Sequence, residues 1–152
     1  MEAFVVDGML GRLAKWLRIL GYDTQYSPDW DDNELARIAR AEGRILLTRD
    51  LELSRRRGLR SLRIEGDLLE GQLAQVVRAL GLELDRPFSR CAVCNTPLEK
   101  VAKHEAWGQV PPYVFQTQSQ LYLCPECNRF YWPGTHWQHM REKLKALEAV
   151  AS

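Results

Sequence analysis

The sequence predicts an α/β fold: a three-layer domain with a mainly parallel sheet, followed by a small region built on four cysteines. Three observations lead to this prediction. Short apolar runs alternate with helical stripes through the first part of the chain. Two of these runs end close to an aspartate, Val6 directly before Asp7 and Thr48 shortly before Asp50. All four cysteines lie after residue 90, where prolines and aromatic residues replace the helical stripes.

The strands are expected at short runs of apolar residues. They are Ala3–Val6, a weaker candidate at Tyr22–Tyr26, Ile45–Thr48 and Ser61–Ile64. Phe4–Val6 and Ile45–Leu47 are apolar at every position and do not alternate with polar residues. A strand of this kind is covered on both faces, as in a parallel sheet with helices packed on each side.

Helices are expected between the strands, because apolar residues recur there at helical spacing and glycines follow them. They are Met9–Leu20, a helix from the acidic turn 27–34 to Gly43, a short helix Leu51–Arg57, Leu69–Leu80, and a closing helix Arg141–Val150. In the first helix, Leu10, Leu13 and Leu17 share one face. Strands and helices that alternate with short links are typical of a parallel α/β sheet.

The chain of 152 residues is expected to divide near Pro87 into an α/β domain, residues 1–87, and a cysteine region with its closing helix, residues 88–152. Hydrophobic residues make up 45% of the chain, which is enough to bury a core. The net charge of +1 provides no bulk attraction to nucleic acid or membrane. The absence of a membrane-spanning apolar run and of an export leader predicts a cytoplasmic protein that does not contact membranes.

The cysteines form two CxxC pairs, Cys91 with Cys94 and Cys124 with Cys127, with residues 95–123 between them. Tetrahedral zinc takes four thiolates, and each CxxC turn presents two of them to one ion. The pattern therefore predicts a structural zinc ribbon, because four cysteines leave no open coordination position for catalysis. Redox-active CxxC pairs are the alternative, but the chain lacks a thioredoxin-like context for them.

Carboxylates at the ends of the predicted strands form a second group. Asp7 follows the first strand, the acidic segment Asp31–Glu34 follows the second, and Asp50 follows the third. Open α/β sheets bind ligands at this carboxyl edge. Several carboxylates at one place repel one another unless a cation is present, and oxygen ligands suit Mg²⁺ or Mn²⁺. The pattern indicates metal-dependent phosphodiester hydrolysis.

Helix capping is the competing interpretation of most of these acids. Asp31 with Glu34 has the spacing of a capping box, as has Asp67 with Glu70, and Asp50 is placed to cap the helix that follows it. Asp7 fits this interpretation less well, because it directly follows a buried strand and precedes a glycine.

Three segments of the first part resemble the PIN-like ribonuclease domain: Phe4–Ala14, Asp31–Leu35 and Leu46–Asp50. Three segments of the second part resemble the zinc ribbon attached to one branch of that fold, the Mut-seven C-terminal RNase family: Arg90–Asn95, Val110–Tyr113 and Tyr131–Trp137. The resemblance covers nearly the whole chain. It implies a PIN-like domain followed by a four-cysteine zinc ribbon and a C-terminal helix.

By this resemblance, Asp7, Asp32 and Asp50 hold a catalytic Mg²⁺ or Mn²⁺ ion, and Glu34 or Asp31 is close enough in sequence to assist. The chain is then a metal-dependent ribonuclease that acts on RNA, with a structural zinc ion in its ribbon. PIN nucleases often carry one more acid, for which this sequence offers only Glu65 and Asp67.

A non-catalytic RNA-binding module is the competing function. The arginines that would meet phosphates are Arg12, Arg49, Arg55, Arg56 and Arg57, with Arg60 and Arg63 nearby. The aromatic residues that would stack on bases are Tyr131, Trp132 and Trp137. The more common role of such arginines is a solvated helix face, and that of such aromatic residues is the core of the ribbon. A phosphotransfer aspartate of the haloacid-dehalogenase kind ranks last, because Met9 stands where such enzymes carry a second aspartate.

Overall fold

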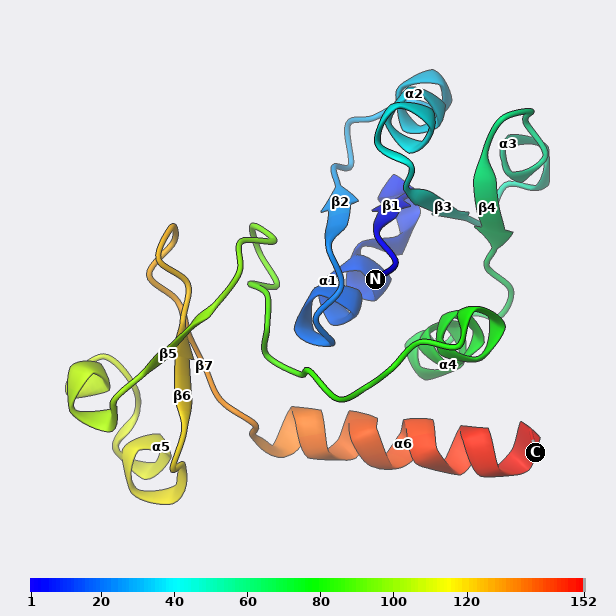
Figure 1. Ribbon diagram of the computed structural model, residues 1–152. Helices are drawn as coiled ribbons and strands as arrows, with labels where there is room; N and C mark the ends of the chain where they lie inside the picture. The colour runs from blue at the N-terminus through cyan, green and yellow to red at the C-terminus, as the bar shows by residue number, and fades with distance from the viewer. Residues whose placement is uncertain (152) are drawn as a thin grey trace.

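A parallel sheet of four strands lies at the centre of the first part of the chain (Figure 1). The computed structural model describes residues 1–151, with side chains through residue 147. The strands are β1 (Phe4–Val6), β2 (Thr24–Tyr26), β3 (Ile45–Thr48) and β4 (Arg60–Arg63). Their order is β2-β1-β3-β4, and every neighbouring pair is parallel. The prediction of a parallel α/β sheet is confirmed.

Helices connect these strands at the expected places. They are a 3₁₀ turn, η1 (Gly8–Leu10), followed by α1 (Gly11–Ile19), α2 (Asp32–Glu42), α3 (Leu51–Ser54) and α4 (Leu69–Leu80). The third helix is shorter than the predicted Leu51–Arg57. It ends early because the chain turns back at Gly58, which has a φ of 77°, to enter β4 on the neighbouring edge of the sheet.

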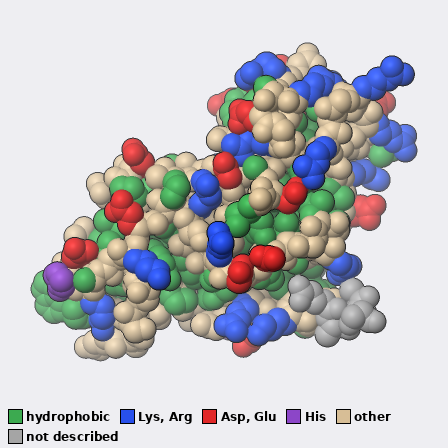
Figure 2. All heavy atoms as spheres, in the orientation of Figure 1, with side chains coloured by type: hydrophobic (Ala, Val, Ile, Leu, Met, Phe, Trp, Pro, Cys, Tyr) green, Lys and Arg blue, Asp and Glu red, His purple; other side chains and the backbone are tan. Residues whose placement is uncertain are grey.

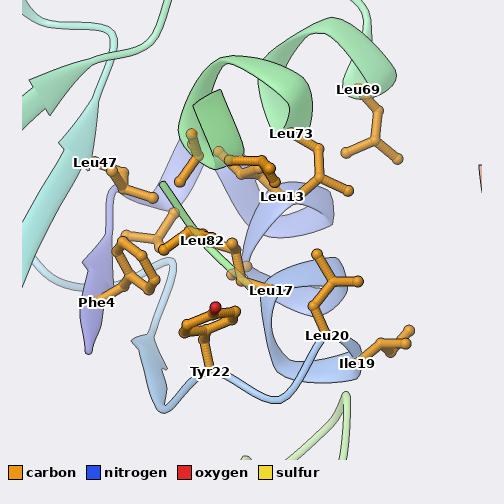
Figure 3. Close-up of a cluster of buried hydrophobic side chains, with 14 of the residues drawn as sticks. Phe4, Leu13, Leu17, Ile19, Leu20, Tyr22, Leu47, Leu69, Leu73 and Leu82 are labelled. Carbon is orange, nitrogen blue, oxygen red and sulfur yellow. The ribbon is translucent and has the colours of Figure 1, made fainter. Parts of the chain in front are cut away.

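Both faces of the central strands β1 and β3 are buried, as the continuous apolar runs predict. Phe4, Val6 and Leu47 face α1 and α4 and belong to the larger core. Figure 3 shows Leu13 and Leu17 of α1 packed with Leu73 of α4 in this cluster. Val5 and Leu46 face the opposite side and pack on α2 and α3. The domain therefore has three layers, with helices above and below the sheet.

The cysteine region forms a separate antiparallel sheet with the order β5-β6-β7. Its strands are β5 (Glu99–Val101), β6 (Leu121–Leu123) and β7 (Phe130–Tyr131). A 3₁₀ turn, η2 (Lys103–Ala106), and a short helix, α5 (Pro112–Thr117), lie between β5 and β6. Ala106, Val114 and Leu121 form a small core of their own.

The last helix, α6 (Thr135–Ala151), begins six residues before the predicted start at Arg141. It runs from the ribbon to a position beneath α4 (Figure 1). Its buried side chains Trp137, Met140 and Leu144 join the larger core of the α/β domain, together with Phe88 and Ala92. The apolar core thus continues across residue 87. None of the helices in the described residues is long and apolar enough to cross a membrane.

Candidate active site and four-cysteine centre

Asp7 and Asp50 lie at the carboxyl ends of two neighbouring strands and share one partner, the buried side chain of Thr48. The Thr48 hydroxyl donates a hydrogen bond of 2.8 Å to Oδ2 of Asp7. The same hydroxyl accepts a hydrogen bond of 3.0 Å from the backbone N–H of Asp50. Asp7 is partly buried, and its own N–H donates to the Leu47 carbonyl on β3. The sheet register therefore fixes both aspartates at one edge.

Capping, the competing role of these acids, is found at two of them. Oδ1 of Asp50 accepts from the Leu53 N–H at 3.1 Å and caps α3, and Oδ1 of Asp31 accepts from the Glu34 N–H at 2.8 Å and caps α2. Asp7 caps no helix with its side chain. Each of Asp7 and Asp50 keeps one carboxylate oxygen without a partner in the described part of the chain.

Asp32 and Glu34 lie in the first turn of α2, which follows the carboxyl end of β2. Asp32 is exposed, and Glu34 forms an ion pair with Arg37 that lowers the pKa of its carboxyl through their hydrogen bond. Arg56, which follows α3, donates a hydrogen bond of 2.8 Å to Asn33. This contact holds the start of α2 beside α3, which Asp50 caps.

The carboxylates do not meet as closely as the sequence pattern suggests. Among the described residues, the four cysteines form the one group of three or more acidic, histidine or cysteine side chains whose ligand atoms all lie within 4.8 Å. Neighbouring carboxylates repel one another, and Glu34 and Asp50 are drawn to other partners. The structure thus links Asp7 and Asp50 through Thr48 and leaves Asp32 exposed on α2.

Neither candidate for a further acid joins Asp7 by a described contact. The prediction that Asp67 caps the fourth helix is wrong, because Leu68 occupies the N-cap of α4 and no side chain bonds there. Asp67 instead forms an ion pair of 3.0 Å with Arg49. Arg49 also donates to the carbonyl of Gly66, so the loop before α4 is held against the end of β3. Glu65 is exposed.

The four cysteine sulfurs converge as the two CxxC pairs predict. The Sγ atoms of Cys91 and Cys127 are 3.4 Å apart, and those of Cys94 and Cys124 are 3.5 Å apart. A tetrahedron of thiolates about 2.3 Å from a zinc ion has edges of about 3.8 Å, so the four thiols match the ligand shell of one ion. Asn95 and Asn128 follow the pairs with φ values of 69° and 58°, as expected for two similar tight turns.

The thiols differ in acidity because of their surroundings. Burial opposes ionisation of Cys91, but hydrogen bonds from the Tyr131 hydroxyl and from nearby backbone N–H groups lower its pKa to about 6. Burial and the neighbouring sulfurs raise the pKa of Cys127 to about 12. Four thiolates at this spacing cannot all carry charge unless a cation is present. The donor set therefore suits a metal ion such as zinc.

Arg18 holds the first CxxC turn to the α/β domain, a role that its place on an amphipathic helix does not reveal. Its guanidinium is buried and donates hydrogen bonds of 3.0 and 3.1 Å to the carbonyls of Ala92 and Val93. Its Nε donates to the carbonyl of Thr24 on β2. The spacing of Arg18 from Leu17 and Leu20 predicts only a helix face, and no sequence signal identifies its partners.

Asn95 makes the second attachment. Its Oδ1 accepts from the Thr24 N–H at 3.0 Å, on the outer edge of the sheet, and its Nδ2 donates to Asp23 at 2.7 Å. Asp23 also accepts from the buried Arg44 at 2.9 Å. Burial opposes the ionised form of Asp23, but the bonds from Arg44 and Asn95 prevail and lower the pKa of its carboxyl. The first CxxC turn is thus docked on β2 by a polar network.

The chain matches one family model over most of its length. Residues 2–144 match the family model described as the Mut7-C RNAse domain. The chain belongs to the Mut7-C RNAse domain family. The match covers both the α/β domain and the cysteine ribbon of this Mut7-C chain, and the family's description is that of a ribonuclease that acts on RNA. No curated protein and no solved structure matches the chain.

The expected RNA contacts of this Mut7-C chain fall in two places. Figure 2 shows Lys and Arg side chains gathered over the region of α2 and α3. Arg55, Arg56 and Arg57 follow directly after α3 in the chain. Arg12 lies elsewhere, exposed in the first turn of α1. The pKa of the Glu70 carboxyl is lowered first by its own backbone N–H and then by Lys143. The nearby charge of Arg12 lowers it further.

The three aromatic candidates of the ribbon have different surroundings. The hydroxyl of Tyr131 lies 3.1 Å from the Cys91 sulfur and accepts from the Ala92 N–H, so Tyr131 supports the cysteine centre. Trp137 is buried and packs edge-on against Phe88, with ring centroids 5.6 Å apart. These two residues belong to the structure of the ribbon and core. Trp132 is half-buried and lines a cleft beside α1.

Proposed function

We propose that this Mut7-C chain is a divalent-metal-dependent ribonuclease whose catalytic site is the carboxyl edge of its parallel sheet. The observation that carries the proposal is the Thr48 hydroxyl, which bridges Asp7 and the backbone of Asp50 at the ends of adjacent strands. A buried polar side chain shared by two acids fixes their positions before a substrate arrives.

Asp7 and Asp50 would hold a Mg²⁺ or Mn²⁺ ion through the carboxylate oxygens that face away from Thr48 and Leu53. Asp32 would complete the set from the first turn of α2, with Glu34 beside it once its pairing with Arg37 opens. When bound, the ion would activate water and stabilise the leaving oxygen at phosphorus. Oxygen donors without sulfur or nitrogen suit such a hard cation.

The protein's own contribution is to orient these acids. Thr48 holds one oxygen of Asp7 and fixes the rotation of its carboxylate. Arg56 keeps the start of α2 beside α3 through Asn33, which stands between Asp32 and Glu34 in the chain, and its charge would also meet a phosphate there. We also propose that the four cysteines hold a structural zinc ion and take no part in the cleavage step.

The test compares Asp7→Asn with Asp29→Asn, an exposed aspartate in the loop before α2. Cleavage of single-stranded and structured RNA is measured with Mg²⁺, with Mn²⁺ and with EDTA, beside a thermal melt of each variant. Asp7→Asn should abolish cleavage and leave the fold intact or more stable without metal, because the substitution relieves repulsion between carboxylates. Asp29→Asn should cleave like the wild type.

Asp50→Asn separates capping from metal binding. Asparagine caps a helix nearly as well as aspartate, so a purely structural Asp50 would leave cleavage unchanged in this variant. Full activity of both Asp7→Asn and Asp50→Asn, or wild-type cleavage that persists in EDTA, would exclude the carboxylate mechanism. RNA binding without cleavage by the wild type would favour the non-catalytic module, which the two capping interactions also permit.

A further inference from the structure

A cleft of about 970 Å³ opens between α1 and the ribbon, outside the cluster of acids. On one side it is lined by Arg12, Lys15 and Trp16 of α1. On the other it is lined by Tyr113 of α5 and by the segment 130–138, which includes Trp132. The cleft thus depends on the docking of the ribbon beside α1, which Arg18 secures through the first CxxC turn.

The charged side chains described in the lining of the cleft are basic. Arg12 and Lys15 are both exposed, one turn apart along α1. No aspartate or glutamate is found among the described residues that line the cleft. A cleft with cations and no carboxylates attracts a phosphate backbone, although the chain as a whole has a net charge of only +1.

The aromatic residues of the cleft offer flat surfaces close to these cations. Trp16 and Trp132 are half-buried, which holds their rings in place and leaves part of each uncovered. Tyr113 is 63% exposed at the start of α5. Basic side chains combined with fixed aromatic rings are the usual means of binding single-stranded nucleic acid, because phosphates meet the cations and bases stack on the rings.

The cleft also leads towards the acids. Asp7 is followed by η1, whose Leu10 N–H bonds to the Asp7 carbonyl, and then by the first turn of α1 with Arg12. From Ile19, the last α1 residue in the cleft, to Arg12 the helix rises by about 10 Å in the direction of Asp7. The Arg12 end of the cleft is therefore the end nearer to Asp7.

We propose that this cleft binds single-stranded RNA, with phosphates on Arg12 and Lys15 and bases stacked on Trp16, Trp132 and Tyr113, and that it feeds the strand to the acidic edge. The choice of RNA rests on the proposed ribonuclease function. A duplex is a poorer occupant, because its bases are stacked on one another and offer no face to the three aromatic rings.

The test measures binding without cleavage. The whole Asp7→Asn chain, with its zinc, is titrated without added Mg²⁺ or Mn²⁺ and without chelator, using fluorescently labelled oligouridylate, oligoadenylate and an RNA duplex. Anisotropy gives the affinity, and the salt dependence gives the number of phosphates met. Single strands should bind at least about tenfold more tightly than the duplex, since one stacked base contributes about 5- to 150-fold.

Variants within the cleft assign the site. Lys15→Gln and Arg12→Gln should each weaken binding and reduce the salt slope by about 1. Trp132→Leu keeps apolar bulk over Gly134 but removes the ring face, and should weaken binding by about 5- to 150-fold. The matched controls are Arg78→Gln on α4 and Trp107→Leu in the ribbon, both exposed and outside the cleft, and they should bind like the parent protein.

Two results would overturn the cleft as the RNA site: equal affinity in Lys15→Gln, Arg12→Gln and the controls, or a duplex bound as tightly as a single strand. Lys15 is exposed, so Lys15→Gln remains informative if Trp132→Leu lowers stability. Binding that depends on the cleft in a protein that never cleaves RNA would refute the nuclease and keep the cleft. RNA cleavage at the same rate in the wild type and in the cleft variants would keep the nuclease and refute the cleft as its RNA site.

Discussion

The buried guanidinium of Arg18, on α1, donates a hydrogen bond of 3.0 Å to the carbonyl of Ala92 inside the first CxxC turn. The two residues are 74 positions apart in the chain. The contact joins the helix that follows the Asp7 strand to the cysteine centre, so the α/β domain and the ribbon support one another.

Arg18→Leu should destabilise the whole chain. The change leaves the carbonyls of Ala92, Val93 and Thr24 without their donor, at a cost of about 2–4 kcal/mol. Urea unfolding measures this cost, and the rate of zinc transfer to a chelator should rise in parallel. Arg78→Leu, an exposed arginine on α4, is the control. If the two variants unfold at the same urea concentration, Arg18 does not fasten the ribbon.

Loss of the metal should expose the ribbon and also weaken the α/β domain. Cys127→Ser should make residues 88–135 sensitive to protease, because the ribbon core of Ala106, Val114 and Leu121 is small. We expect a loss of more than about 2 kcal/mol, equivalent to about 4–8 °C in the melting temperature. The wild type should contain one zinc per chain, and the exposed Val93→Ser variant should retain it. Wild-type protein without zinc, or with the four sulfurs far apart, would contradict this prediction.

Thr48→Val should lower the rate of RNA cleavage, although the two side chains have nearly the same shape and size. The substitution keeps the shape of a fully buried side chain but removes the hydroxyl that bonds Asp7 and Asp50. A residue that orients metal ligands typically affects activity by about 10- to 100-fold. Thr48→Ser keeps the hydroxyl and should restore most of the rate, even if the lost methyl costs about 1 kcal/mol of stability. Equal activity in the valine and serine variants would show that the hydroxyl does not matter.

Asp23 should make the docking of the ribbon dependent on pH. Its folded-state pKa is depressed by Arg44 and Asn95, so its contribution to stability is complete above the unfolded value of about 3.9 and is lost as the pH falls through the folded value. Asp23→Asn should cost about 1–2 kcal/mol at neutral pH, because the carboxylate is about one-third exposed. Urea unfolding of both proteins at several pH values measures the difference, which should shrink below pH 4. A difference that stays constant with pH would assign the effect to packing.

The sequence alone determined the parts that depend on local pattern. Continuous apolar runs require strands that are covered on both faces, and they predicted β1 and β3 together with the parallel sheet. The CxxC spacing predicted four converging sulfurs, because a short turn fixes the geometry of each pair. The spacing of Asp31 and Asp50 before helices predicted their capping roles, which require only neighbouring backbone N–H groups.

The tertiary structure decided everything that depends on residues far apart in the chain. A helical stripe cannot reveal that Arg18 is buried against residues 92 and 93, nor that α6 begins at Thr135 and packs on α4. The same limit applies to the acids. Their sequence positions predict one edge of the sheet, but hydrogen bonds across the fold join Asp7 to Asp50 through Thr48, and Asp32 stays exposed on α2. Such contacts form only when distant segments pack, so no local pattern encodes them.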